Sequence, residues 1–333
     1  MQTSGAGGAD IDAELLSVKD LKVEFHTPAG ILRAVDGISF SIRKGEVVGL
    51  VGESGSGKTV TALSVMGLLP SYARISGAIR LAGKDILNSS PEEMRAVRGK
   101  AIAMIYQDPL TSLNPVLRVG DQISEGIVAH GVLPKSEADR EAVRLMKTVG
   151  IPDAEQRSRD YPHQFSGGMR QRVVVAMALA CHPEVLVADE PTTMLDLITQ
   201  DGILDLIRQL RNETGSTIFI THDLGIVAEV CDRVIIMYAG KIVETGDVHT
   251  VFKRHRHPYT HGLLESVPRI DASTRVLKAI EGALPNMIEP PSGCAFHPRC
   301  PYADSRCSQM DPRLLETESG HRVACIRAEE IHF

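Results

Sequence analysis

The stretch GESGSGKT at residues 52–59 decides the fold class, because it matches the spacing G-x-x-x-x-G-K-[ST]. A short apolar run at 47–51 precedes it, and a helical pattern of apolar residues at 61–69 follows it. The glycines let the backbone curl between strand and helix, so that successive N–H groups point to one place at the positive end of the helix dipole. This arrangement predicts a loop that binds phosphate groups.

We expect side chains and backbone of this loop to hold a nucleotide together. The Lys58 ammonium would reach the β- and γ-phosphates, and the Thr59 hydroxyl would ligate Mg²⁺. The other positions expected to contact the nucleotide are Gly52, Ser54, Gly55, Ser56 and Gly57. A glycine-rich turn that matches by chance is the alternative, and the flanking strand and helix patterns argue against it.

Apolar runs of strand length recur along the chain. They lie at residues 46–51, 101–106, 185–188, 217–220 and 234–237. Because these runs are continuous and β-branched, with helical patterns between several of them, they predict buried strands of a parallel sheet. Shorter alternations at 16–25 and 34–42 predict an antiparallel sheet, and the stretch from 108 to 170 shows only helical spacing. We therefore expect an α/β core with an antiparallel β subdomain and a helical subdomain.

Three parts of the chain are expected. Residues 1–14 are predicted to be flexible, residues 15–250 to form the nucleotide-binding domain, and residues 251–333, which prolines interrupt, to form a loop-rich C-terminal domain.

The 43% hydrophobic content argues against disorder, and the net charge of −6 gives no basic footprint for nucleic acid. No apolar run could span a membrane and the amino terminus lacks a signal pattern, so the sequence predicts a cytoplasmic protein.

Two carboxylates end the apolar run at 185–188. Asp189 is expected to complete the Mg²⁺ shell, and Glu190 to polarise the attacking water as the general base. A paired Asp-Glu at a strand end is often only a solvated turn, so this assignment depends on the phosphate loop being present in the same chain.

Residues 165–171, FSGGMRQ, resemble the signature motif of the ABC-type ATPases. They precede a predicted helix at 172–180, so that Ser166, Gly167 and Gly168 would form a second anion cradle at a helix start. The resemblance implies an ATPase with a P-loop NTPase core, in which ATP binds between the phosphate loop of one subunit and the signature of another.

Further markers of the same family occur in the expected order. The resemblance implies that Gln107 contacts Mg²⁺ and the attacking water, that Asp196 belongs to the D-loop, and that His222 contacts the γ-phosphate. Phe25 stands where the family has an aromatic residue stacked on adenine, although a packed core residue is an equal alternative. These assignments make Glu190, His222 and Gln107 the expected catalytic residues.

Three residues depart from the usual family pattern. Phe165 replaces a leucine at the start of the signature, Met169 occupies its fifth position, and Met194 stands where a small residue commonly precedes the D-loop. None of these changes removes a group that contacts phosphate, so the site is expected to be active.

The chain from about residue 15 to 327 resembles the ATPases of dipeptide and oligopeptide importers. The similarity rests on QDPLTSLNP at 107–115, HPYT at 257–260 and the late cysteines. It implies peptide uptake at the cytoplasmic face of the inner membrane, with a second and different ATPase subunit, two permease subunits and an extracytoplasmic binding protein. Import of nickel or another small solute is one alternative, and a soluble ABC protein without a transport role is another.

Four cysteines lie in the last forty residues: Cys294, Cys300, Cys307 and Cys325. Their spacing does not fit the close pairs of zinc fingers. The family resemblance implies a 4Fe-4S ligand set and hence a small metal-binding C-terminal domain. Zn²⁺ bound by the same thiolates, or four unligated thiols, are the alternatives.

Overall fold

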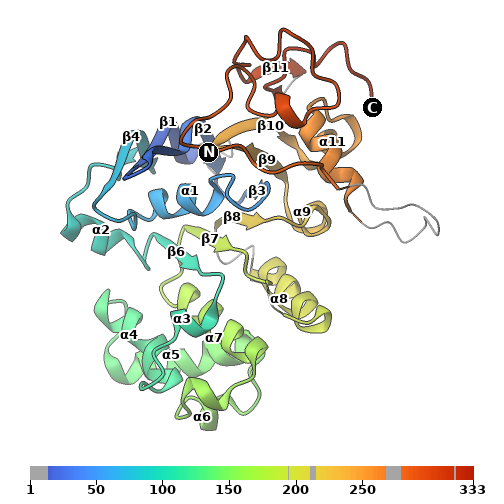
Figure 1. The fold of residues 1–333 in the computed structure, drawn as a ribbon. Coiled ribbons are helices and arrows are strands. Elements are labelled where there is room, and N and C mark those ends of the chain that lie inside the picture. The colour runs from blue at the N-terminus through green and yellow to red at the C-terminus, as the bar shows by residue number, and fades with distance from the viewer. Residues whose placement is uncertain (1–13, 194, 211–214, 268–278, 319) are drawn as a thin grey trace, which may run out of the picture.

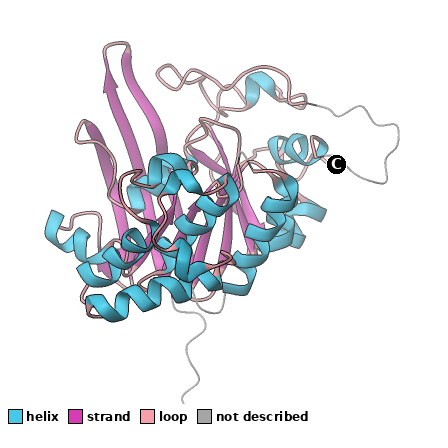
Figure 2. Cartoon of the chain, turned by 90° about the horizontal axis from the view of Figure 1, so that it is seen from below, coloured by secondary structure: helices cyan, strands magenta, loops and turns pink. Residues whose placement is uncertain are grey.

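The computed structural model describes residues 14–193, 195–210, 215–267, 279–318 and 320–333. Within these ranges the chain forms two sheets that are bordered by helices (Figures 1 and 2). The expected α/β core is confirmed. Of the amino-terminal residues 1–14 that the sequence predicts to be flexible, residues 1–13 lie outside the described residues, as does Met194.

The smaller sheet is antiparallel, as the alternating patterns predicted. Its strands in spatial order are β2 (Gly30–Arg43), β1 (Glu14–Thr27), β4 (Ala73–Leu81) and β5 (Lys84–Asp85). Strands β1 and β2 form a hairpin in which Thr27 pairs with Gly30 across a two-residue turn. The inward side chains of these strands, such as Leu21 and Ile38, are fully buried against the larger sheet's core.

The larger sheet carries the five predicted apolar runs as parallel neighbours. They are β6 (Ile102–Ile105), β7 (Val185–Asp189), β8 (Ser216–Thr221), β3 (Val47–Val51) and β9 (Arg233–Tyr238). Every residue of β3 and β7 is buried, which explains why these strands read as continuous apolar runs. Because these five strands run parallel, their carboxyl ends lie at the same edge of the sheet.

Three antiparallel strands extend this sheet beyond β9. They are β10 (Lys241–Asp247), β12 (His321–Val323) and β11 (Leu315–Glu318). Because β12 pairs with β10, two strands of the carboxyl-terminal part continue the core sheet, and the division into domains at residue 250 stays a prediction. These two strands are short and have little apolar content, and the sequence patterns did not reveal them.

The helical subdomain forms a lobe on one side of the large sheet, and its helices lie together in Figure 1. It contains α3 (Pro109–Ser112), α4 (Val119–Ala129), α5 (Lys135–Thr148), α6 (Ala154–Arg157), the 3-10 turn η1 (Pro162–Gln164) and α7 (Gly167–Leu179). Buried side chains such as Ile123, Met146 and Val173 join these helices into one core with the neighbouring strands. The prediction of an all-helical insertion is confirmed.

The remaining helices border the sheets. They are α1 (Lys58–Val65), α2 (Pro91–Val97), α8 (Leu197–Leu210), α9 (Leu224–Val230), α10 (Val248–Arg254), α11 (Pro258–Glu265) and the 3-10 turn η2 (His297–Arg299). Tyr238, Tyr259 and Phe296 pack together and attach α11 and the tail to β9. Across the described ranges, no helix is both long and apolar enough to cross a membrane.

Candidate nucleotide site

The loop at 52–57 joins β3 to α1 and has little room for larger residues. A Cβ atom added to Gly52 would lie 2.2 Å from the backbone oxygen of Met237, and one added to Gly57 would lie 2.5 Å from the oxygen of Ala34. Gly57 also has a φ of 104°, in the region that favours glycine. The position of this loop therefore requires glycine at both ends.

Polar groups of the loop fold toward its interior. The Lys58 ammonium donates hydrogen bonds to the backbone oxygens of Gly52 and Glu53, at 2.7 and 2.9 Å. The Ser56 hydroxyl is fully buried and has no hydrogen-bond partner in the part of the chain that the structure describes. An ammonium on backbone oxygens together with an orphaned hydroxyl fits a loop that binds phosphate oxygens.

Two carboxylates at the end of β7 lie close to this lysine. Burial lowers the pKa of Lys58, and the charges of Glu190 and Asp189 oppose that shift. Burial likewise raises the pKa of Asp189, whose side chain accepts a hydrogen bond from the Thr59 hydroxyl at 3.3 Å. Thr59 and Asp189 thus place a hydroxyl and a carboxylate oxygen together, which is the oxygen chemistry that Mg²⁺ requires.

Glu190 stands at the centre of a second group of polar side chains. Its carboxylate accepts a hydrogen bond from the Gln107 amide at 3.0 Å and another from the Thr193 hydroxyl at 2.9 Å. The Nδ1 atom of His222 lies 3.4 Å from its other oxygen. Because β6, β7 and β8 are parallel neighbours, the residues that follow them meet at one edge of the sheet.

The backbone of Glu190 adopts a left-handed conformation, with a φ of 47°. Its N–H donates to the backbone oxygen of Ile220 on β8 at 2.9 Å, which holds the residue in this conformation. A non-glycine residue in a strained backbone conformation, beside several polar side chains, is typical of a functional site. The structure thus brings Gln107, Glu190 and His222 together, and their catalytic roles stay a prediction.

The signature and D-loop residues lie elsewhere. Ser166 caps α7 through its hydroxyl, which accepts from the Met169 N–H at 3.3 Å, and Asp196 accepts from the Thr199 N–H at 3.0 Å at the start of α8. A Cβ atom on Gly168 would lie 2.3 Å from a methyl carbon of Thr199, so the two segments pack closely. Figure 1 shows α7 in the helical lobe and α1 against the sheets, so one chain does not bring the signature to its own phosphate loop.

Phe25 is partly buried near the end of β1. Its ring lies 6.0 Å from the ring of Tyr72, at an interplanar angle of 57°. This contact leaves the expected stacking of Phe25 on adenine as a prediction.

The four late cysteines line one small cavity of about 20 Å³. Burial raises the pKa of Cys294, and it raises the pKa of both Cys300 and Cys325 to about 11. No group of three or more His, Cys, Asp or Glu side chains within the described ranges is arranged to hold a metal ion. The predicted metal-binding domain and its 4Fe-4S cluster are therefore not supported, because the thiols share a cavity without forming a ligand set.

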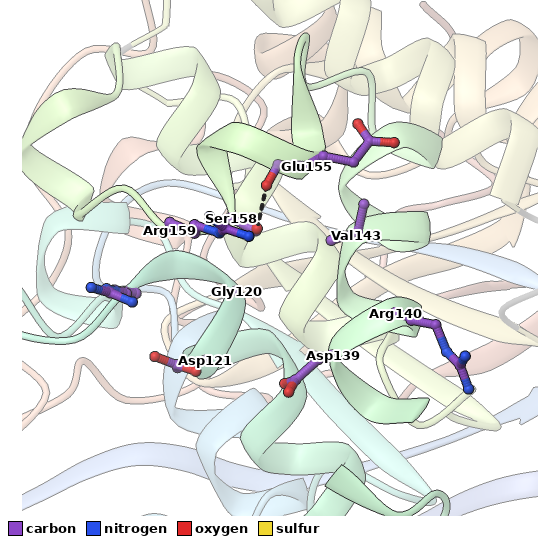
Figure 3. A pocket seen from close by; sticks show the side chains of 9 residues that line it. Gly120, Asp121, Asp139, Arg140, Val143, Glu155, Ser158 and Arg159 are labelled. Atoms are coloured by element: carbon purple, nitrogen blue, oxygen red, sulfur yellow. Dashed lines mark hydrogen bonds between the residues drawn. The ribbon is translucent and has the colours of Figure 1, made fainter. Parts of the chain in front are cut away.

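A larger cavity of about 560 Å³ opens in the helical lobe, and Figure 3 shows the charged side chains at its border. Arg140 and Arg159 lie on this border together with Asp121, Asp139 and Glu155. None of the predicted nucleotide-binding residues lines it, so it is separate from the site at the sheet edge.

Sequence reasoning missed two residues that hold the phosphate loop from the carboxyl-terminal part of the chain. The Arg299 guanidinium contacts the Glu53 carboxylate, and the Tyr259 hydroxyl accepts a hydrogen bond from the Glu53 N–H at 2.8 Å. More than 200 residues separate these partners, so local patterns contain no signal for either contact. The HPYT stretch at 257–260 contributed to the family resemblance, but it indicated no contact between Tyr259 and Glu53.

Comparison with known proteins gives two family matches. A profile described as ABC transporter matches residues 35–193, and one described as the oligopeptide/dipeptide transporter C-terminal region matches residues 243–307. The chain is 48% identical to the oligopeptide transport ATP-binding protein OppD of Escherichia coli, over 95% of this chain and 94% of that protein. It is 49% identical to the dipeptide transport ATP-binding protein DppD of Bacillus subtilis, over 94% of each.

Solved structures agree with the fold. CbiO1 from Clostridium perfringens, part of the ABC transporter complex CbiONQ, has a TM-score of 0.60 and 30% identity, covering 72% of this chain and 91% of that one. The bacterial ABC transporter cassette MJ0796 has a TM-score of 0.62 at 24% identity, covering 70% of this chain and 98% of that one. The latter likeness concerns the fold alone.

Proposed function

Because this chain belongs to the family of ABC-type ATPases of oligopeptide and dipeptide transport, we propose that it hydrolyses ATP to energise uptake of di- or oligopeptides. One observation carries the enzymatic part of this proposal. Lys58, Thr59 and Asp189 lie beside Glu190, which itself contacts Gln107. This is a phosphate-binding loop next to a carboxylate held in place for proton transfer.

Each group has a proposed role in hydrolysis. Lys58 and the backbone N–H groups of the loop bind the β- and γ-phosphates. Thr59 and Asp189 would hold Mg²⁺, with Gln107 as a further ligand, and the ion supplies charge neutralisation on the phosphates when bound. Glu190 accepts a proton from the attacking water, and His222 contacts the γ-phosphate.

Two chains are proposed to act together. The signature residues Ser166, Gly167 and Gly168 lie in the helical lobe, away from the phosphate loop of the same chain. A facing subunit would bring its signature, with its residue equivalent to Asp196, to this loop and close over the nucleotide. We propose a related but different ATPase subunit as that partner, with Phe25 stacking on the adenine.

Two permease subunits are the proposed membrane partners. Large apolar side chains are exposed on both sides of Gln107 in the sequence: Tyr106 before it at about two fifths, and after it Leu110 at 63%, Val116 at 75% and Leu117 at about two fifths. Such a cluster on a soluble domain favours a protein contact, and a short cytoplasmic permease helix would cover it. The chain would then lie peripherally at the cytoplasmic face of the membrane, with a binding protein delivering the solute on the other side.

The proposal is tested by reconstituting the chain in proteoliposomes with the permeases, the second ATPase and the binding protein that are encoded beside its gene. We expect ATP hydrolysis to rise when the binding protein is loaded with a dipeptide or tripeptide. Stimulation by a nickel complex and not by peptides would favour the nickel alternative. Stable association with ribosomes and none with the permeases would overturn the transport role.

We also propose that the four thiols of the late cysteines bind a metal centre, a 4Fe-4S cluster in preference to Zn²⁺. What supports this is that all four line one cavity and that thiolates are soft ligands suited to iron–sulfur or zinc. Cys294, Cys300, Cys307 and Cys325 would have to shift to become ligands, since their present arrangement does not form a metal site.

Anaerobic purification of the full chain tests the metal proposal. A cluster predicts brown protein, broad absorption near 400 nm and stoichiometric iron, all lost in Cys300→Ser. Cys181→Ser is the control, because Cys181 lies outside the cavity. A colourless protein with bound zinc would show that the metal is Zn²⁺ and not iron. A metal-free protein would overturn the proposal altogether.

A further inference from the structure

An ion pair joins the carboxyl-terminal tail to the phosphate loop. The Arg299 guanidinium, in η2, donates to both oxygens of the Glu53 carboxylate, at 2.8 and 3.1 Å. The Arg299 side chain is only 7% exposed and that of Glu53 is 27% exposed. A two-pronged, largely buried arginine–carboxylate pair is stronger and more directional than a surface pair.

The same part of the molecule holds the backbone of the loop. Tyr259, which is fully buried in α11, accepts a hydrogen bond from the Glu53 N–H at 2.8 Å. Arg299 itself is fixed by the backbone oxygens of Glu281 and Ile280, to which it donates at 2.9 and 3.2 Å. Position 53 of the phosphate loop is therefore held by two segments that lie outside the α/β core of the nucleotide site.

The charge of Glu53 creates an electrostatic problem for this loop. Glu53 lies beside Lys58, whose ammonium donates a hydrogen bond to the Glu53 backbone oxygen at 2.9 Å. It is therefore also close to where phosphate oxygens must bind, and a bare carboxylate there would repel an anionic ligand. In the structure Arg299 supplies the compensating positive charge.

We propose that Arg299 is a positioning residue for nucleotide binding, which neutralises Glu53 and fixes its side chain so that the loop accepts the phosphates of ATP. The role rests on the proposed ATPase function. It does not involve the reacting atoms, because Arg299 acts through Glu53. It makes the carboxyl-terminal tail a part of the nucleotide site.

The test compares Arg299→Gln with the double variant Arg299→Gln/Glu53→Gln, in the full chain and in the reconstituted transporter. Loss of the charged hydrogen bonds in the single variant is expected to raise the KM and Kd for ATP roughly tenfold, with kcat within about twofold of wild type. The double variant removes the repelling carboxylate as well, so its Kd for ATP is expected to return close to the wild-type value.

A matched control comes from the helical lobe. Arg144 makes a similar two-pronged pair with Glu141, at 2.8 and 2.6 Å, and Arg144→Gln is expected to leave the Kd for ATP unchanged. The thermal midpoint of every variant is measured alongside, because Arg299 also holds the tail. A purely structural role would lower the midpoint of both Arg299 variants equally and would leave the double variant as weak in ATP binding as the single one.

The outcomes separate this inference from the proposed function. Equal ATP affinity of wild type and Arg299→Gln, or no recovery in the double variant, overturns the role of Arg299 while the ATPase function stands. A wild-type chain that neither binds nor hydrolyses ATP in the same assays overturns the proposed function itself.

Discussion

Replacing Glu190 with glutamine tests the proposed general base with little change in shape. Glutamine has the same length, and its amide oxygen can still accept the hydrogen bonds from Gln107 and Thr193. The left-handed backbone at this position is no more strained for glutamine than for glutamate. The variant therefore removes the proton acceptor and keeps the contacts around it.

The expected loss follows from the role of a general base. Proton transfer by a positioned side chain contributes about 10²- to 10⁴-fold to a rate, which corresponds to about 3 to 5 kcal/mol of barrier. The free energy of unfolding should change by less than about 1 kcal/mol, because the polar contacts have replacements. Nucleotide binding should persist, since Lys58 and Thr59 are unaltered.

The assay measures phosphate release by the reconstituted transporter together with the Kd for ATP of the same preparation. Glu190→Gln should bind ATP as tightly as wild type, or more tightly, and turn over at least a hundredfold more slowly. Asp205→Asn, on the exposed face of α8, serves as the control and should keep wild-type turnover. Turnover within about threefold of wild type in Glu190→Gln would remove Glu190 from the role of general base.

Three further changes test other parts of the reasoning. Gly57→Ala places a Cβ atom against a backbone oxygen at a φ of 104°, so we expect a loss of about 1–3 kcal/mol in unfolding free energy and weakened ATP binding; unchanged titrations of both would contradict the steric argument. Ser90→Ala removes a capping box with Glu93 and should lower the urea-measured stability by about 1 kcal/mol, whereas Ser90→Asp should keep it. Burial opposes protonation of His321, but the hydrogen bonds and charges of Glu244 and Glu318 together outweigh it and raise the pKa of His321. Its stabilisation is therefore complete below about pH 6.5 and decreases as the pH rises through the raised pKa. The difference in stability between wild type and His321→Gln should therefore shrink as the pH rises above about 6.5, and a constant difference would exclude this linkage.

Short-range patterns predicted most of the candidate nucleotide site. The loop at 52–59 and the carboxylates Asp189 and Glu190 each follow a continuous apolar run, and such runs become adjacent parallel strands when buried on both faces. Parallel strands all present their carboxyl ends at the same edge, so the residues after them converge without any further information. This is why Gln107 and His222 could be assigned to the site from sequence order and family resemblance.

Long-range contacts could not be read in this way. The short strands β11 and β12 contain few apolar residues, so local patterns do not reveal that β12 pairs with β10 and β11 with β12. The buried contact between His321 and Glu244 likewise joins residues that are far apart in the sequence. The four cysteines have a spacing that resembles a cluster ligand set, but coordination requires four sulfur atoms at defined positions, and the fold places them around a cavity without that arrangement.

The sequence by itself determined that this protein is an α/β ATPase of the ABC type, because its motifs are local and each one fixes the chemistry of the strand end on which it lies. Only the tertiary structure decided that the carboxyl-terminal tail contacts the phosphate loop. Glu53 and Arg299 are 246 residues apart, and neither charge has a local reason to be where it is. Their pairing arises because the packing of Tyr259 and Phe296 against β9 brings the tail onto the phosphate loop.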